Sequence, residues 1–122
     1  MEALKRAKNV SDFYNQLINI RYKNGQVSFF YRKHFFTDWA NGSKLIADDI
    51  TKNLSPKHVT VDKYLNMKNN NELYLPGIKV VKRKISYLPS DVVDEKVINQ
   101  LKTGDYIGAY TKINGLDVSH VG

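Results

Sequence analysis

The feature that most constrains the fold is a predicted β-hairpin over residues 104–122. Residues 106–113 are rich in strand-forming side chains, and Asn114-Gly115 is the strongest two-residue signal for a hairpin turn. With this turn, the expected cross-strand pairs are Ile113 with Leu116, Thr111 with Val118, and Ala109 with His120.

His120 lies on the return strand of this predicted hairpin. Because strand side chains alternate between faces, it should share a face with Ile107, Ala109, Thr111, Ile113, Leu116 and Val118. An imidazole at the end of a mostly apolar face suits a general base, and it is more often a structural histidine. Asp117 and Ser119 point away from it on a strand, so they do not form a triad with His120. Neither a nucleophile nor an orienting group is visible nearby.

The chain has 122 residues and a net charge of +7, which fits one basic domain. A basic surface suits nucleic acid, phospholipid or an anionic cell-wall polymer, and it also serves solubility. The one dense group of cations, within residues 79–84, is predicted to be a solvated strand edge. No RNA-binding motif or arginine-rich tract accompanies it, so nucleic-acid binding is suggested by the charge alone.

The sequence contains no cysteine, which excludes disulfides, thiolate metal sites and a cysteine nucleophile within these residues. The spacing of His34, His58 and His120 matches no metal-ligand motif, so we predict no metal and no cofactor. The longest apolar run is far too short to span a membrane. No signal peptide is visible, because no apolar core follows the first charges.

The expected order of elements is that of an α+β protein. Residues 1–24 are predicted to be helical with a break, with Asn9 or Ser11 as the second N-cap and Gly25 as the end. Strands are predicted over 60–67 and 80–88, with a polar loop between them, and short helices over 38–47 and 94–101. No linker or internal repeat divides the chain.

Residues 31–39 combine aromatic side chains with His34 and Asp38. Such a group suits a sugar or peptide ligand, which needs stacking surfaces and a few directed hydrogen bonds. The alternative is an aromatic cluster packed beneath a loop. We favour packing for Phe29, Phe30, Phe35 and Phe36, and both interpretations remain open for Asp38 and Trp39.

Four segments occur in the same order in one known family: residues 18–25, 34–39, 104–107 and 115–122. The chain resembles the N-acetylmuramoyl-L-alanine amidase-like branch of the NlpC-type, papain-like cell-wall hydrolases over nearly its whole length. The most specific blocks are His34-Phe-Phe-Thr-Asp-Trp39 and Gly115-Leu-Asp-Val-Ser-His-Val-Gly122.

The resemblance implies a papain-like α+β fold, with an antiparallel sheet packed against helices and incomplete in this chain. It implies a bacterial cysteine hydrolase that cuts the amide between N-acetylmuramic acid and L-alanine in peptidoglycan fragments, in the periplasm or outside the cell. His120 corresponds to the general base that completes a thiolate–imidazolium pair. His34, Asp38 and Trp39 would lie on the sugar-binding side of the cleft.

The family's cysteine is absent from this sequence, and the resemblance places it upstream of Met1. The residue that orients His120 would lie beyond Gly122. We therefore expect residues 1–122 to be the interior part of a larger amidase domain, inactive alone. The alternative is a binding module that holds anionic glycan or peptide in an aromatic groove without turnover.

Overall fold

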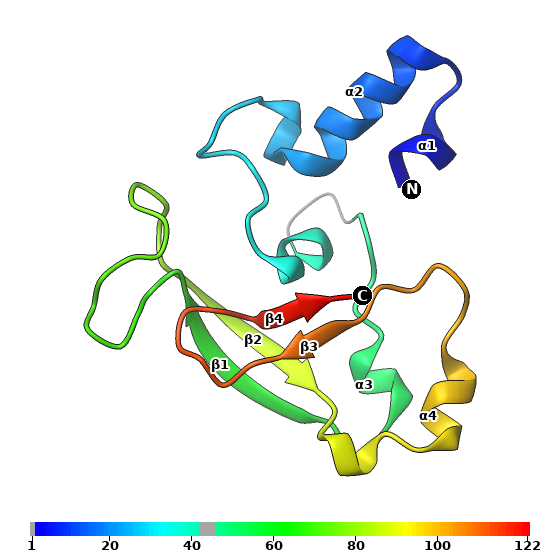
Figure 1. Ribbon diagram of the computed structural model, residues 1–122, viewed down its shortest axis with the longest axis vertical. Coiled ribbons are helices and arrows are strands. Elements are labelled where there is room, and N and C mark those ends of the chain that lie inside the picture. Colours follow the sequence, from blue (N-terminus) through cyan, green and yellow to red (C-terminus); the bar gives the residue numbers. More distant parts are fainter. Residues whose placement is uncertain (1, 42–45) are drawn as a thin grey trace.

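The computed structural model describes residues 2–41 and 46–122 and has an α+β architecture (Figure 1). The helices are α1 (Glu2–Arg6), α2 (Val10–Arg21), α3 (Thr51–Leu54) and α4 (Glu95–Gln100), with 3₁₀ turns η1 (Lys23–Gly25), η2 (Phe36–Ala40) and η3 (Ser90–Val92). The strands are β1 (Val59–Leu65), β2 (Val81–Tyr87), β3 (Gly108–Tyr110) and β4 (Val118–Val121). β1 pairs with β2 and β3 with β4, both antiparallel. The α+β class and the antiparallel pairing are thus confirmed.

The N-terminal helices α1 and α2 lie together at the end of the molecule away from α3 and α4 (Figure 1). The Asn9 side chain accepts a 2.8 Å hydrogen bond from the Asp12 N–H, so the predicted N-cap is confirmed. The helix ends at Arg21, earlier than predicted, because Tyr22 is extended and forms an isolated bridge with Arg32. Gly25, the predicted end, instead takes a left-handed φ of 67° in the following turn.

One expected helix differs from the structure, and one helix of the structure was not expected. Residues 38–47 were predicted to be one helix, whereas η2 covers Phe36–Ala40 and residues 42–45 lie outside the described part of the chain. The short helix α3 was not predicted, since its four residues are too few for a periodic apolar pattern. α4 forms as expected, with the Asp94 side chain accepting from the Val97 N–H at 3.0 Å.

The hydrophobic core joins the aromatic block to both strand pairs. Its buried members are Phe35, Leu65 and Ile85, and Val61, Tyr110 and Leu116 pack against them. On β1, Lys63 and Leu65 are buried while Asp62 and Tyr64 are exposed, as the alternation of strand side chains requires. Tyr110 of the hairpin stacks on Tyr87 of β2 with ring centroids 3.9 Å apart. The two strand pairs therefore pack against each other.

The hairpin forms, but its register differs from the prediction. Ala109 pairs with His120 as expected, whereas Tyr110, not Thr111, pairs with Val118. Ala109 and Tyr110 are consecutive on β3, whereas their partners His120 and Val118 are two positions apart on β4. Ser119 is therefore the extra residue of a β-bulge. The turn over Ile113–Leu116 is present, with the Leu116 N–H 3.4 Å from the Ile113 carbonyl. Only Gly115 has a positive φ there, 87°, as in a type II turn.

The loop between β3 and β4 surrounds the ammonium group of Lys63. This residue is buried, with 8% of its surface exposed. It donates hydrogen bonds to the carbonyl groups of Thr111, Ile113 (2.9 Å) and Leu116 (2.7 Å). These carbonyls face the lysine, and the strand ladder stops at Tyr110. Burial lowers the pKa of Lys63, and the Asp117 carboxylate nearby opposes that effect.

Replacing Lys63 with methionine should therefore loosen this loop. Three carbonyl groups would then lack a buried hydrogen-bond donor, which destabilises the folded state. We therefore expect the free energy of unfolding, measured by urea titration, to fall by at least about 2 kcal/mol. Lys82 on β2 is exposed, and Lys82→Met should change the free energy by less than about 0.5 kcal/mol. Equal unfolding midpoints for the two variants would contradict this role of Lys63.

Candidate functional site

His120 is exposed on β4, opposite Ala109. Its Nδ1 lies 3.4 Å from the Ser119 hydroxyl, and its Nε2 has no hydrogen-bond partner within the described residues. The imidazole is therefore accessible to a second reactant, as a general base must be.

The bulge changes which residues share a face with His120. A Cβ atom built on Gly108 would lie 2.6 Å from Val118 Cγ1 and 2.7 Å from Phe36 Cε1. Gly108 and Val118 thus belong to the inner face of the hairpin, which packs on Phe36. His120 and its partner Ala109 belong to the outer face. The prediction that Val118 shares a face with His120 is therefore wrong, because the inserted residue, Ser119, reverses the alternation of side chains between them.

The predicted sugar-side residues lie in η2 and just before it, and their polar atoms contact the protein itself. His34 Nε2 is 2.7 Å from the Phe29 carbonyl oxygen, and Trp39 Nε1 donates to the Ile20 carbonyl at 3.1 Å. Asp38 Oδ2 accepts from the backbone N–H of His34 at 3.0 Å. Substrate binding by these three residues stays a prediction. The contacts establish that the His34 ring is bonded to the segment before it, Trp39 to the end of α2, and Asp38 to the His34 backbone.

Asp38 also forms a buried ion pair with Arg83 of β2. Asp38 Oδ1 lies 2.7 Å from Arg83 Nη1, and the two side chains are 7% and 10% exposed. Arg83 also donates to the Thr37 hydroxyl at 2.9 Å. Its Nε is buried without a partner among the residues that the structure describes. The predicted solvated edge over residues 79–84 is therefore wrong for Arg83.

Asp117 links the strand of His120 to the turn of Asp38. It is 3% exposed, and its Oδ2 accepts from both the backbone N–H and the hydroxyl of Thr37, each at 2.8 Å. Its Oδ1 accepts from the Val118 N–H at 2.9 Å. The sequence analysis gave Asp117 no partner. No local sign indicated its burial, because a polar residue between two apolar neighbours is ordinarily the solvent-facing position of a strand.

We name the connected side chains Asp38, Arg83, Thr37 and Asp117 the polar network. It spans two strands and η2, and it carries two carboxylates and one guanidinium group. It joins the His34–Trp39 block to the strand that carries His120.

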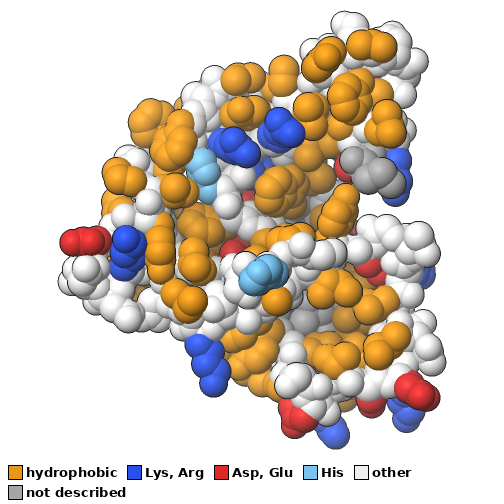
Figure 2. Space-filling model, viewed as in Figure 1, with side chains coloured by type: hydrophobic (Ala, Val, Ile, Leu, Met, Phe, Trp, Pro, Cys, Tyr) orange, Lys and Arg blue, Asp and Glu red, His pale blue; other side chains and the backbone are white. Residues whose placement is uncertain are grey.

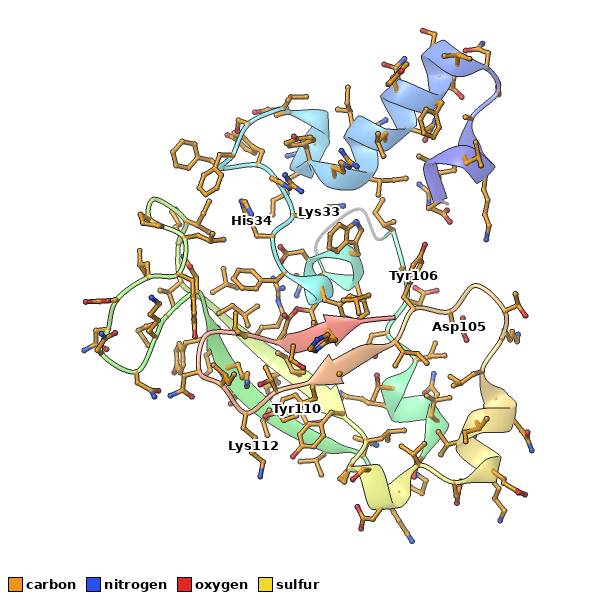
Figure 3. The ribbon with its side chains drawn as sticks, viewed as in Figure 1. Lys33, His34, Asp105, Tyr106, Tyr110 and Lys112 are labelled. Atoms are coloured by element: carbon orange, nitrogen blue, oxygen red, sulfur yellow. The ribbon has the colours of Figure 1, made fainter. Side chains whose placement is uncertain are left out.

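Two aromatic residues expected to pack are instead exposed. Phe29 and Phe30 are 48% and 63% exposed, whereas Phe35 is in the core as predicted. The Phe29 ring lies 4.8 Å from the His34 ring, centroid to centroid. Figure 3 labels His34 and Lys33 on the segment that leads from α2 to η2. Hydrophobic side chains gather on much of the face shown in Figure 2.

The described residues contain no group of three or more potential metal ligands. Within the same ranges, no helix has both the length and the apolar character needed to cross a membrane.

The whole chain matches one known protein family. A family described as AmiA-like, N-acetylmuramoyl-L-alanine amidase-like, matches residues 1–122. The chain belongs to this amidase-like family. No curated protein and no solved structure matches it significantly. Membership of the AmiA-like family associates the chain with cell-wall amidases and with peptidoglycan as the substrate, and it confirms the amidase-like part of the resemblance.

Breaking the buried ion pair should destabilise the fold strongly. Arg83→Met leaves the Asp38 carboxylate without its cation, so we expect the free energy of unfolding to fall by about 3–5 kcal/mol. The double variant Asp38→Asn/Arg83→Met should lose less, since neither member of the pair is left as an unpaired buried charge. Lys84→Met, at an exposed β2 position, is the matched control. A double variant as unstable as the sum of its single variants would contradict the pairing.

Proposed function

We propose that this AmiA-like chain is the part of a cysteine-dependent N-acetylmuramoyl-L-alanine amidase that supplies the general base, His120. The observation that carries the proposal is the family match over residues 1–122, together with an accessible imidazole on the outer face of β4. The 122 residues contain no cysteine, so the nucleophile would come from residues outside them. An NlpC-type, papain-like arrangement of the complete site belongs to the same proposal.

In this mechanism the cysteine thiolate attacks the lactyl carbonyl carbon of N-acetylmuramic acid. The C–N bond breaks as the His120 imidazolium gives its proton to the leaving amine of L-alanine, and a thioester remains. His120 then takes a proton from water, whose hydroxide attacks the thioester. The products are the free lactyl carboxylate of the sugar and a peptide that begins with L-alanine, and the thiolate is regenerated. An oxyanion hole is also required.

The polar network supports this role by fixing the strand of His120. Asp117 lies three positions before the histidine and is bonded to Thr37, which adjoins Asp38. The same link places the half-buried rings of His34 and Trp39 in a fixed relation to β4. We propose that these two rings contact the sugar, while Asp38 holds their turn. A periplasmic or extracellular location belongs to the same proposal.

A binding module without turnover is the second candidate, and the absence of cysteine favours it. In that case the exposed Phe29 and Phe30 rings would serve as stacking surfaces for a glycan. The two candidates predict different consequences for removal of the His120 imidazole.

The test compares variants of the natural protein that carries this chain together with the proposed cysteine. His120→Ala should lower the release of the L-alanine peptide from N-acetylmuramoyl-L-alanyl-D-isoglutamine by at least about 100-fold, because the general base is lost. Substitution of the proposed cysteine should abolish hydrolysis. His58→Ala removes a half-buried imidazole near Ser55 and should retain activity.

Two results would overturn the proposal. One is full hydrolysis by His120→Ala, and the other is hydrolysis by the purified 122-residue chain, which has no cysteine. Muropeptide binding without hydrolysis by the natural protein would favour the binding module instead.

A further inference from the structure

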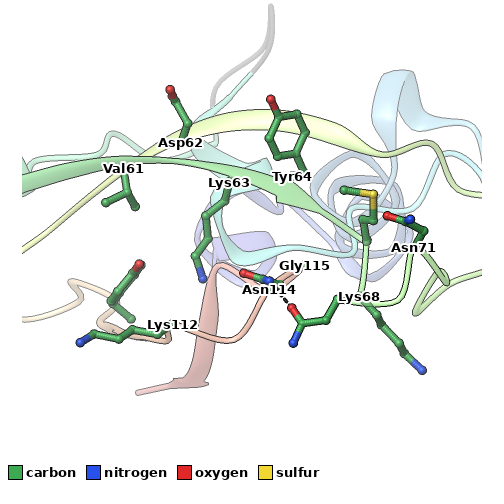
Figure 4. Close-up of a pocket in the computed structure, with 12 residues that line it drawn as sticks. Val61, Asp62, Lys63, Tyr64, Lys68, Asn71, Lys112, Asn114 and Gly115 are labelled. Atoms are coloured by element: carbon green, nitrogen blue, oxygen red, sulfur yellow. Dashed lines mark hydrogen bonds between the residues drawn. The ribbon is translucent and has the colours of Figure 1, made fainter.

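A cavity of about 350 Å³ lies on the side of the hairpin opposite His120, between β1, residues 67–71 and the hairpin loop (Figure 4). Tyr110 lines this cavity and belongs to the inner face of the hairpin, whereas His120 pairs with Ala109 on the outer face. The cavity is therefore separate from the proposed catalytic base. Its volume falls within the range of sites that hold small ligands.

The walls of this cavity are fixed by hydrogen bonds between distant parts of the chain. The Asn66 side chain is completely buried, accepts from the Leu75 N–H at 2.7 Å and donates to the Ile78 carbonyl at 2.9 Å. The Asn66 N–H donates to the Gly115 carbonyl at 2.8 Å. The Asn114 amide donates to Asn69 across the cavity wall (Figure 4). A site held in this way need not be ordered by its ligand.

Close packing at Gly115 holds the hairpin turn against the loop after β1. A Cβ atom on Gly115 would lie 2.7 Å from the Met67 carbonyl oxygen and 2.7 Å from the Tyr74 ring. The turn therefore has no room to move toward the loop, and the two walls keep their separation.

The chemistry of the lining favours an anionic ligand that also needs hydrogen bonds. The Lys63 ammonium is bonded to three carbonyl groups, and that of Lys68 lies 5.0 Å from the centroid of the Tyr74 ring. Lys112 is the third lysine in the lining and is exposed. Asn69, Asn71 and Asn114 supply amides that donate and accept, as acetamido and peptide groups require. Asp62 also lines the cavity, and Figure 4 shows its side chain directed to the opposite side of β1 from Lys63, so the lysines outnumber the carboxylates in the lining.

We propose that this cavity binds the carboxylate-bearing peptide of a muropeptide, at a site distinct from the one where the amide is cut. The identity of the ligand rests on the proposed function, since peptidoglycan fragments combine carboxylates with amides. Lys68 and Lys112 would pair with a carboxylate, and the asparagine amides would bond to the peptide backbone. The bound fragment would be a neighbouring part of the polymer, because the cavity and His120 lie on opposite faces.

The experiment is an NMR titration of the 122-residue chain with N-acetylmuramoyl-L-alanyl-D-isoglutamine. We expect the side-chain amide signals of Asn69, Asn71 and Asn114 to shift. Lys68→Gln/Lys112→Gln should weaken binding about tenfold, as the loss of two exposed charge contacts predicts. Lys82→Gln/Lys84→Gln removes the same charge from exposed β2 positions and should bind as the unaltered chain does. The probe with its carboxylate amidated should bind as weakly as the cavity variant.

Three results would overturn this inference. The first is the absence of shifts at the three asparagines. The second is equal binding by both double variants. The third is equally strong binding of inorganic phosphate at the same residues, which would indicate a general anion site. Shifts confined to the surroundings of His120 would overturn the cavity site and leave the proposed function intact. Cavity binding by a natural protein that hydrolyses no muropeptide would do the reverse.

Discussion

The buried charges of Asp38, Arg83 and Asp117 are the constraint on which the rest of this fold depends. Each charge must have partners, because an unpaired ion in a protein interior is strongly destabilising. The partners come from β2, from η2 and from the start of β4, so satisfying them brings three distant segments together. The buried hydrophobic residues are few in the described part of the chain: Ala3, Phe35, Leu65, Ile85 and Val97.

Lys63 and Asn66 act in the same way on the other side of the hairpin. Lys63 meets the carbonyl groups of one loop, and Asn66 meets both the loop after β1 and the Gly115 carbonyl. Lys63 lies near the end of β1, and Asn66 directly follows the strand. The positions of the hairpin, of His120 on one face and of the cavity on the other are thus set by polar groups that belong to the first strand pair.

The local elements were predictable from the sequence because each has its own signal. Asn9 marks the start of α2, Asn114-Gly115 marks the hairpin turn, and the β-formers near residues 59–65 and 81–87 mark the first strand pair. The burial of Arg83 and Asp117 was not predicted, because their partners are 45 and 80 positions away along the chain. Arg83 lies two positions before Ile85, so the two side chains share a face of β2. This spacing was a weak sign that Arg83 points inward. No local rule indicated that Phe29 and Phe30 would be exposed while Phe35 is buried.

The bulge at Ser119 has a consequence for how the orientation of His120 is encoded. The face on which the imidazole lies depends on the number of residues between Tyr110 and His120, because Ser119 is inserted into that strand. Deletion of Ser119 would reverse the orientation of the imidazole, whereas a substitution at this position would leave the residue count unchanged. Comparisons with related sequences should therefore count residues here before they compare them.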